Sequence, residues 1–392
     1  FLAGYFARRW EPLRQAGAPR LHHVLPVLAG VAAALMLFFV QKDLGPALLL
    51  SLMFLAMFAV ARGGAWLAGA GCAGLAAGFA IGFFLNISAT LAARLQMWQS
   101  PWDNAVRGGD QVAQALWALS AGALTGTGAG FGHSRFVPEG HTDMVLAAVG
   151  EEFGLLGLVI VGAAFLLVAW RGFTIAKRAS TDHQFFLALG MTLSLTIPVL
   201  VMGAGILGLL PLTGVVTPFL SYGGSAMAAN FAALGFLAAI RRKGSESTDL
   251  TPFQAPVRWL ARTAAACAAG MLLFAASVQT LRADEYLVRP QLSVQADGGR
   301  RFQYNPRVLD ALRSIPRGTI YDRRGLPIAS SDAGVLQKAA GAYEQIGRKL
   351  GDVCAPAPNG AAQLTHRCYP AGPALQHVLG DANTRDSWTA AN

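Results

Sequence analysis

Long apolar runs separated by short polar loops dominate the chain from residue 21 to residue 281. Runs that approach twenty apolar residues match the hydrocarbon thickness of a bilayer. We therefore predict an all-α polytopic membrane protein. The predicted spans are residues 21–40, 47–60, 66–85, 144–170, 185–207, 225–240 and 261–281.

Basic residues occur in alternate loops along this pattern. Short loops rich in Lys and Arg face the cytoplasm in membrane proteins, so we expect the intervening loops and everything after residue 281 to be extracytoplasmic. This topology accounts for the net charge of +10 and leaves no role for nucleic acid. The basic residues are Arg8, Arg9, Arg14, Arg20, Arg62, Arg171, Lys177, Arg178, Arg241, Arg242, Lys243, Arg258 and Arg262.

Composition agrees with a membrane protein that carries a polar C-terminal part. The chain of 392 residues is 54% hydrophobic, which is too apolar for an ordinary soluble protein. Residues 244–260 read as a cytoplasmic linker before a lone span at 261–281. Residues 282–392 read as a small extracytoplasmic α+β or partly disordered segment. Cys354 and Cys368 lie there, and the sequence leaves open whether they form a disulfide.

Charge is densest in residues 137–157, VPEGHTDMVLAAVGEEFGLLG. A helix starting near Asp143 would put Glu151 roughly 12 Å further along, at membrane depth. Ionisable groups at that depth by default suggest function, and partial desolvation suits a carboxylate to general-base work. The structural alternative is that Thr142 or Asp143 caps the helix, while Glu151 and Glu152 pair with basic residues.

Other polar groups fall on the same predicted face. They are Asp43, the loop from residue 86 to residue 142, and Ser221-Tyr222-Gly223-Gly224. The loop includes Arg94, a predicted amphipathic or re-entrant helix at 111–124, and the glycine-rich run at 122–132. Guanidinium groups such as that of Arg94 match phosphate oxygens. The glycines permit close backbone approach, or they serve tight helix packing.

Four ordered motifs resemble the SEDS family, typified by FtsW and RodA. They are QKDLG, GALTGTGAG, VPEGHTDMVLAAVGEEFGLLG and PLTGVVTPFLSYGGS. The resemblance implies a peptidoglycan glycosyltransferase of the bacterial cytoplasmic membrane that polymerises lipid II with Asp143 as its catalytic residue. Met144 stands where the family usually has phenylalanine. The substrate-binding candidates are Asp43, Arg94, Glu139, His141, Thr142, Ser221, Tyr222, Gly223 and Gly224.

A second resemblance covers the C-terminal part. Asn305-Pro306-Arg307 and the segment RGTIYDRRG at 317–325 are similar to the opening segments of a class B penicillin-binding protein, for which residues 261–281 would be the membrane anchor. No S-x-x-K or K-T-G motif is present, so no transpeptidase site is expected. We interpret the chain as a fusion fragment: residues 1–243 would hold about six of the ten family spans, and the fragment itself would be inactive.

The two resemblances imply further partners and leave alternatives open. Lipid II, undecaprenyl-linked glycan, membrane lipid and other cell-wall synthesis proteins are expected partners, with the penicillin-binding partner fused in cis. A divalent cation such as Mg²⁺ or Mn²⁺ near Asp143 would offset pyrophosphate charge. The alternative functions are a lipid II flippase and a non-catalytic activator of the penicillin-binding partner. The sequence does not choose between elongation, division and sporulation.

Overall fold

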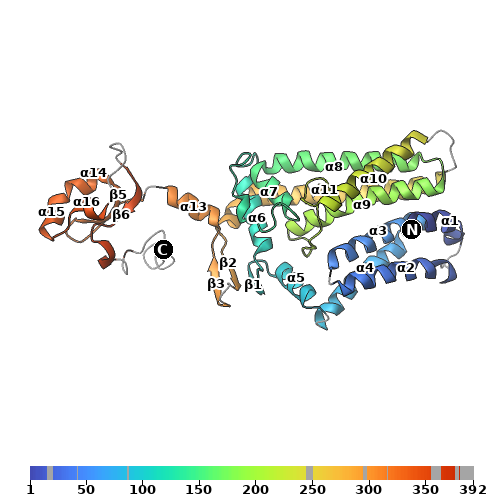
Figure 1. Ribbon diagram of the computed structural model, residues 1–392, viewed down its shortest axis with the longest axis horizontal. Helices are drawn as coiled ribbons and strands as arrows, with labels where there is room; N and C mark the ends of the chain where they lie inside the picture. The colour runs from blue at the N-terminus through green and yellow to red at the C-terminus, as the bar shows by residue number, and fades with distance from the viewer. Residues whose placement is uncertain are drawn as a thin grey trace. The chain divides into compact units, whose positions relative to one another are not determined.

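The computed structural model describes residues 1–15, 21–41, 43–85, 88–243, 250–294, 298–315, 317–354, 363–375 and 379. The chain divides into two compact units, Phe1–Asn305 and Pro306–Asn392. Each unit is described by itself, and Figure 1 labels the elements of both.

The first unit is a bundle of helices. Within the described residues, six helices are long and apolar enough to cross a membrane: α3, α4, α8, α9, α10, and α11 with its π-helical extension η2. Helix α2 carries a shorter apolar stretch, His22–Phe38. The predicted all-α membrane fold is therefore confirmed. The helices are α1 Leu2–Gln15, α2 Leu21–Val40, α3 Leu44–Arg62, α4 Trp66–Phe84, α5 Ala89–Gln99, α6 Gln111–Gly122, η1 Ser134–Phe136, α7 Val145–Glu152, α8 Gly154–Lys177, α9 Asp182–Ile206, α10 Gly224–Lys243, α11 Thr251–Ala276, η2 Ser277–Leu281 and α12 Ala283–Val288.

Helix α9 lies at the centre of the larger hydrophobic core. It packs against α1, α3, α8, α10 and α11. Buried aromatic rings join three of these helices: Phe185 of α9 lies 4.4 Å from Phe253 of α11, and Phe186 lies 5.8 Å from Phe6 of α1, measured between ring centroids. All four rings are fully buried. Aromatic side chains bury the largest apolar areas, so this cluster fixes how the helices pack.

The predicted span 144–170 is two helices in the structure. Helix α7 ends at Glu152 and α8 begins at Gly154, whose φ is +64°. A Cβ on Gly154 would lie 2.4 Å from the backbone nitrogen of Gly126, so only glycine fits at this break. The expectation that Glu151 sits along a continuous transmembrane helix was therefore wrong. Glu151 lies near the end of a short helix that packs on the glycine-rich loop.

Helix α11 begins ten residues earlier than the predicted span. Its first turn contains Pro252, which suits the start of a helix. Phe253 and Val257 are fully buried in the larger core, so the stretch that we interpreted as linker is anchored by packing. Residues 244–249 of that predicted linker lie outside the described residues.

The loop between α4 and α7 is more ordered than the sequence indicated. The predicted helix at 111–124 is present as α6 but is not amphipathic: its polar Gln114 and Ser120 are buried along with its apolar side chains. The fully buried Trp117 donates a hydrogen bond from Nε1 to the carbonyl of Arg289, 3.1 Å away. Helix α5 was not predicted. The loop is a packed layer over the helix ends.

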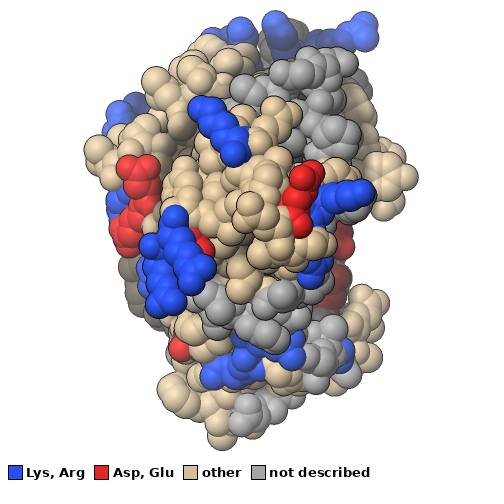
Figure 2. Space-filling view, turned by 90° about the vertical axis from the view of Figure 1, so that its left-hand side faces the viewer, with Lys and Arg blue, Asp and Glu red and all other residues tan. Residues whose placement is uncertain are grey.

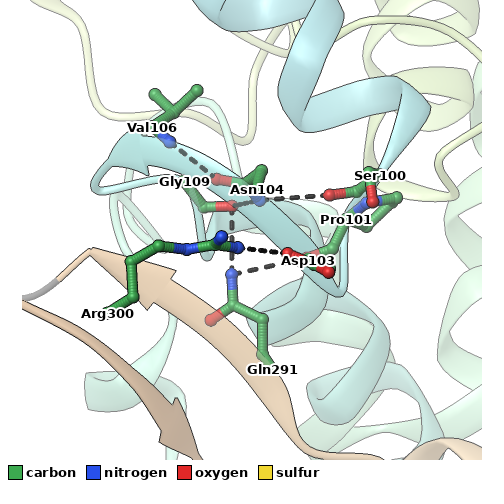
Figure 3. A network of polar contacts seen from close by, with 8 residues as sticks. All are labelled: Ser100, Pro101, Asp103, Asn104, Val106, Gly109, Gln291 and Arg300. Atoms are coloured by element: carbon green, nitrogen blue, oxygen red, sulfur yellow. Dashed lines mark hydrogen bonds and ion pairs between the residues drawn. The ribbon is translucent and has the colours of Figure 1, made fainter.

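A three-stranded sheet joins this loop to residues that follow α11. Strand β1 (Asp103–Arg107) pairs in parallel with β2 (Gln291–Val294), and β2 pairs antiparallel with β3 (Arg300–Gln303). Figure 3 shows the polar network that ties β1 to the two later strands. Residues 282–305 therefore belong to the first unit, whereas the sequence placed them at the start of the C-terminal segment.

The second unit holds a small antiparallel sheet with short helices. Its strands, in spatial order, are β4 (Ile320–Tyr321), β5 (Pro327–Asp332) and β6 (Gln363–Cys368). A disulfide joins Cys354 to Cys368. The sequence DRRG forms the β4–β5 turn, in which Asp322 accepts hydrogen bonds from the backbone nitrogens of Arg324 and Leu326, each 2.8 Å away. The helices are α13 Pro306–Ser314, α14 Ala333–Lys338, α15 Ala340–Gln345, α16 Leu350–Val353 and η4 Gly372–Leu375.

Basic side chains lie in separate groups on the face shown in Figure 2. They are more prominent there than acidic side chains. This excess of basic side chains agrees with the net charge of +10.

Candidate active site at Asp143

Asp143 lies in the tight loop between η1 and α7 and is half-buried. The backbone carbonyl of Glu139 accepts hydrogen bonds from the nitrogens of Thr142 and Met144, at 3.0 and 3.1 Å. Glu139 has φ of +52°, a left-handed conformation that costs a non-glycine residue energy. The hydroxyl of Thr142 lies 2.9 Å from Glu139 Oε2 and 3.2 Å from Asp143 Oδ1, so it bridges the two carboxylates.

Helix capping does not account for Asp143. The N-cap of α7 is Met144, which makes no side-chain capping hydrogen bond. The alternative that Thr142 or Asp143 serves only as an N-cap was therefore wrong. A half-buried carboxylate without that structural use is available for chemistry.

Arg94, on helix α5, extends towards Asp143. It donates a short hydrogen bond to the carbonyl of Leu212. A Cβ on Gly214 would lie 3.1 Å from Arg94 Nη2 and 3.6 Å from Asp143 Oδ2. Gly214 has φ of +69°, and as a glycine it adopts this conformation without strain and leaves room for both side chains. The guanidinium and the carboxylate therefore flank one backbone position.

The surroundings of Asp143 raise its pKa. Burial raises the pKa of Asp143 above its usual value of 3.8, because desolvation penalises the charged form. Hydrogen bonds from its own backbone and from Thr142 lower that pKa, the negative charge of Glu139 raises it, and the positive charge of Arg94 lowers it. A raised pKa moves the carboxylate towards the range in which a general base works best.

The segment around Ser221 is fastened to the Asp143 loop. Ser221 is buried, donates a hydrogen bond from Oγ to the carbonyl of Thr142, and accepts one from the nitrogen of Thr217 at 2.7 Å. The nitrogen of Tyr222 donates to the carbonyl of His141 at 2.9 Å. The rings of His141 and Tyr222 lie 6.3 Å apart and are both exposed. Two predicted motifs far apart in the sequence thus form one surface.

The remaining candidate site residues differ in how close they lie to the Asp143 site. Asp43 is exposed at the start of α3 and makes no capping hydrogen bond there. Its neighbour Gly45 packs so tightly that a Cβ would lie 2.6 Å from the carbonyl of Thr213, so the Asp43 turn abuts the Gly214 segment. Gly223 and Gly224 have no left-handed φ. A Cβ on Gly223 would make only an ordinary contact, 3.6 Å from Ala226 Cβ, and a Cβ on Gly224 would meet nothing within 4 Å, so close backbone approach does not explain these glycines. Lys42 lies outside the described residues.

Glu151 and Glu152 hold the glycine-rich loop in place. The fully buried Glu151 accepts a hydrogen bond from the nitrogen of His133 at 2.8 Å, and Glu152 accepts one from Gly130 at 3.2 Å. Their backbone carbonyls accept from Thr127 and Gly128 at 3.0 Å each. These carboxylates thus bind backbone amides, which the sequence interpretation missed. The sequence does contain a signal for this arrangement: glycine stands at every second position from 126 to 132, and two glutamates follow each other at 151 and 152.

The comparisons agree with the motifs. Residues 1–246 match the family FTSW_RODA_SPOVE, described as "Cell cycle protein". Peptidoglycan glycosyltransferase RodA of Mycobacterium leprae (strain TN) is 34% identical over 222 residues, which are 57% of this chain and 47% of that protein. Probable peptidoglycan glycosyltransferase FtsW of Geobacter sp. (strain M18) is 31% identical over 240 residues, 60% of this chain and 64% of that protein.

A solved structure adds a comparison at the level of the fold. It is described as "Structural coordination of polymerization and crosslinking by a peptidoglycan synthase complex". It has a TM-score of 0.50 and 25% sequence identity, covering 63% of this chain and 68% of that one. The chain spans about half the length of the RodA relatives that it matches. Because the family match covers well over half of its residues, this chain belongs to the FtsW, RodA and SpoVE family of cell cycle proteins.

Proposed function

We propose that this protein contributes the catalytic site of a peptidoglycan glycosyltransferase that polymerises lipid II. The observation that carries the proposal is the half-buried Asp143, with its raised pKa, beside the guanidinium of Arg94. The relatives named above carry the same activity in their names. Since the chain spans about half of the RodA relatives, the activity of the whole protein remains part of this proposal.

The proposed reaction is an inverting displacement. The C4 hydroxyl of one lipid-linked disaccharide attacks the anomeric carbon of a lipid-linked glycan. A new C–O glycosidic bond forms, the bond from the anomeric carbon to the pyrophosphate oxygen breaks, and undecaprenyl pyrophosphate leaves with its electron pair. The Asp143 carboxylate accepts the hydroxyl proton, for which a raised pKa is favourable.

Arg94 would stabilise the negative charge that develops on the leaving group. One of its guanidinium nitrogens is held by the Leu212 carbonyl, which fixes the orientation of the side chain. Fixed donors aimed at developing charge are among the strongest contributions to catalysis. The exposed rings of His141 and Tyr222 would contact sugar, while buried Ser221 and Thr142 would hold the loop in position.

A divalent cation fits the carboxylates present. Within the described residues there is no cluster of three potential metal ligands from His, Cys, Asp or Glu. However, Mg²⁺ is commonly held by one or two carboxylates together with substrate phosphates. Asp143 and Glu139, bridged by Thr142, are such a pair. When bound, the cation would neutralise pyrophosphate charge.

The C-terminal part would be the start of a class B penicillin-binding partner, with α11 as its anchor. The β1–β2–β3 sheet supports this, since strands that follow α11 pair with the loop that precedes the Asp143 segment. The Cys354–Cys368 disulfide suits an oxidising, extracytoplasmic compartment. The proposed location is therefore the cytoplasmic membrane, with the second unit outside.

Polymerisation by the purified full-length protein tests the proposal. The protein in lipid is supplied with lipid II, and glycan chains are measured for wild type, Asp143→Asn and Asp284→Asn. Asp284 is exposed on α12 and provides a matched loss of one charge. We expect Asp143→Asn to lose about 10²–10⁴-fold in rate, as for removal of a general base. Equal polymer from all three would refute the catalytic role, and loss of lipid translocation alone would favour a flippase.

A further inference from the structure

We propose that a groove between α8, α9 and α11 binds one anionic phospholipid of the bilayer. Its acyl chain would lie along the apolar wall, and its headgroup phosphate would contact Lys177, Arg258 and Arg262. The groove has a volume of about 490 Å³ and includes residues from all three helices. That volume lies within the range of about 300–1,000 Å³ that is usual for ligand sites.

The walls of the groove are almost entirely apolar. Leu158, Phe165 and Leu200 are among the lining side chains. Near one end the helices pack closely, since a Cβ on Gly203 would lie 2.3 Å from Met271 Cε. Further along α11 the lining residues Ala264, Ala265 and Ala268 are small and leave space beside α8. In a membrane, a lipid chain is the available apolar material to fill that space.

Positive charge is confined to one end of the groove. Helix α8 reaches this end at Lys177 and α11 passes it at Arg258 and Arg262. Among the described residues, no Asp or Glu lines the groove. Within the described part of the chain, Arg258 makes one hydrogen bond, from Nε to the Gln254 carbonyl of its own helix at 3.4 Å, and its terminal nitrogens are left to face a ligand. Guanidinium and ammonium groups that converge on an apolar slot complement a lipid phosphate.

The location of the charged end identifies the leaflet and separates this ligand from the polymerisation substrate. Basic helix ends face the cytoplasm, where anionic lipids are enriched and basic pockets between transmembrane helices bind their headgroups. The 24 residues of α8 separate Lys177 from the helix end near Asp143 by about 36 Å. The lipid would therefore act as a bridge between α11 and the α8–α9 pair at the opposite face.

Lipid titration of the delipidated full chain, followed by native mass spectrometry, tests this proposal independently of polymerisation. The probes are dioleoylphosphatidylglycerol and dioleoylphosphatidylcholine. The variant Lys177→Gln/Arg258→Gln/Arg262→Gln is compared with Arg8→Gln/Arg9→Gln/Arg178→Gln. The control removes the same charge from exposed positions, two of them on α1 and one just after α8. Thermal unfolding of each variant establishes that it is folded.

We expect wild type to retain one phosphatidylglycerol in preference to phosphatidylcholine. Each basic side chain near an anionic headgroup contributes roughly five-fold, so the groove variant should bind about 100-fold more weakly, while the control keeps most of the affinity. Ala268→Phe, which fills the slot, should lose lipid although all charges remain. Equal binding by the two triple variants, no preference between the lipids, or a second protein copy in place of lipid would overturn the proposal.

Discussion

Ser221 donates a hydrogen bond from its side chain to the backbone carbonyl of Thr142, across 79 residues of sequence. This bond joins the segment that precedes α10 to the loop that presents Asp143. Ser221 is buried, with 5% of its surface exposed, and Thr142 is half-buried. The position of the Asp143 carboxylate therefore depends on a residue that need not touch substrate.

Replacing Ser221 by alanine should loosen the Asp143 loop. The variant removes the donor to Thr142 and leaves the buried nitrogen of Thr217 without its acceptor. An unsatisfied buried group costs about 1–3 kcal/mol. We expect faster amide hydrogen exchange in residues 137–144 and a fall in kcat of about ten-fold or more. Tyr222→Phe keeps the backbone bond to His141 and serves as the control for the exchange measurement. Unchanged exchange in Ser221→Ala would remove the positioning role.

The pH dependence of polymerisation should report the environment of Asp143. A base is active when deprotonated, so the rate should fall as pH drops through its raised pKa. Arg94→Gln removes an influence that lowers this pKa and should move the acid limb to higher pH. Glu139→Gln removes an influence that raises the pKa and should move the limb to lower pH. Shifts in the same direction would contradict the assigned charges.

The raised pKa of Asp143 also predicts how the stability of the protein depends on pH. Because the folded-state pKa of Asp143 lies above its unfolded value, ionisation of Asp143 costs folding free energy. That cost is absent below the unfolded pKa, grows as pH rises, and is complete above the folded pKa. Asp143→Asn should therefore raise Tm at neutral pH while it lowers the rate of polymerisation. No gain in Tm relative to Asp284→Asn would contradict the raised pKa.

Glu151 should behave as a structural residue. Glu151→Ala removes the acceptor for the His133 nitrogen and opens a cavity where the side chain is fully buried. We expect a loss of about 2–5 kcal/mol in unfolding free energy. Glu151→Gln keeps an acceptor oxygen and should cost less, and it should retain polymerisation once folded. If Glu151→Gln abolished polymerisation in a fully folded protein, the residue would have a direct role in the reaction.

The sequence predicted the helices well because length and hydropathy determine a membrane span. It also grouped Asp143, Arg94 and Ser221, which the structure brings together. It failed where a local backbone feature overrides the apolar pattern, as at Gly154, where one left-handed residue divides a continuous apolar run. It also failed for β1, because β2, the strand that pairs with Asp103–Arg107, lies almost 190 residues later. Such pairings leave no short-range pattern.

The sheet that joins β1 to β2 and β3 should depend on its buried amides more than on its ion pair. Asn104 donates to the carbonyls of Gly109 and Ser100 at 2.9 and 3.1 Å, and the fully buried Gln291 also donates to Gly109, at 3.2 Å (Figure 3). The Asp103–Arg300 pair is exposed, and exposed pairs contribute about 0–1 kcal/mol. Asn104→Ala and Gln291→Ala should therefore speed amide exchange in β2 and β3 by at least ten-fold, since each removes one of the two donors to the Gly109 carbonyl and the donor to a second carbonyl, that of Ser100 or of Pro101. Arg300→Gln should change that exchange by less than about five-fold, and the difference should persist at high salt, which screens only the ion pair. A larger effect from Arg300→Gln than from Asn104→Ala would mean that the exposed charges, rather than the buried amides, hold the strands together.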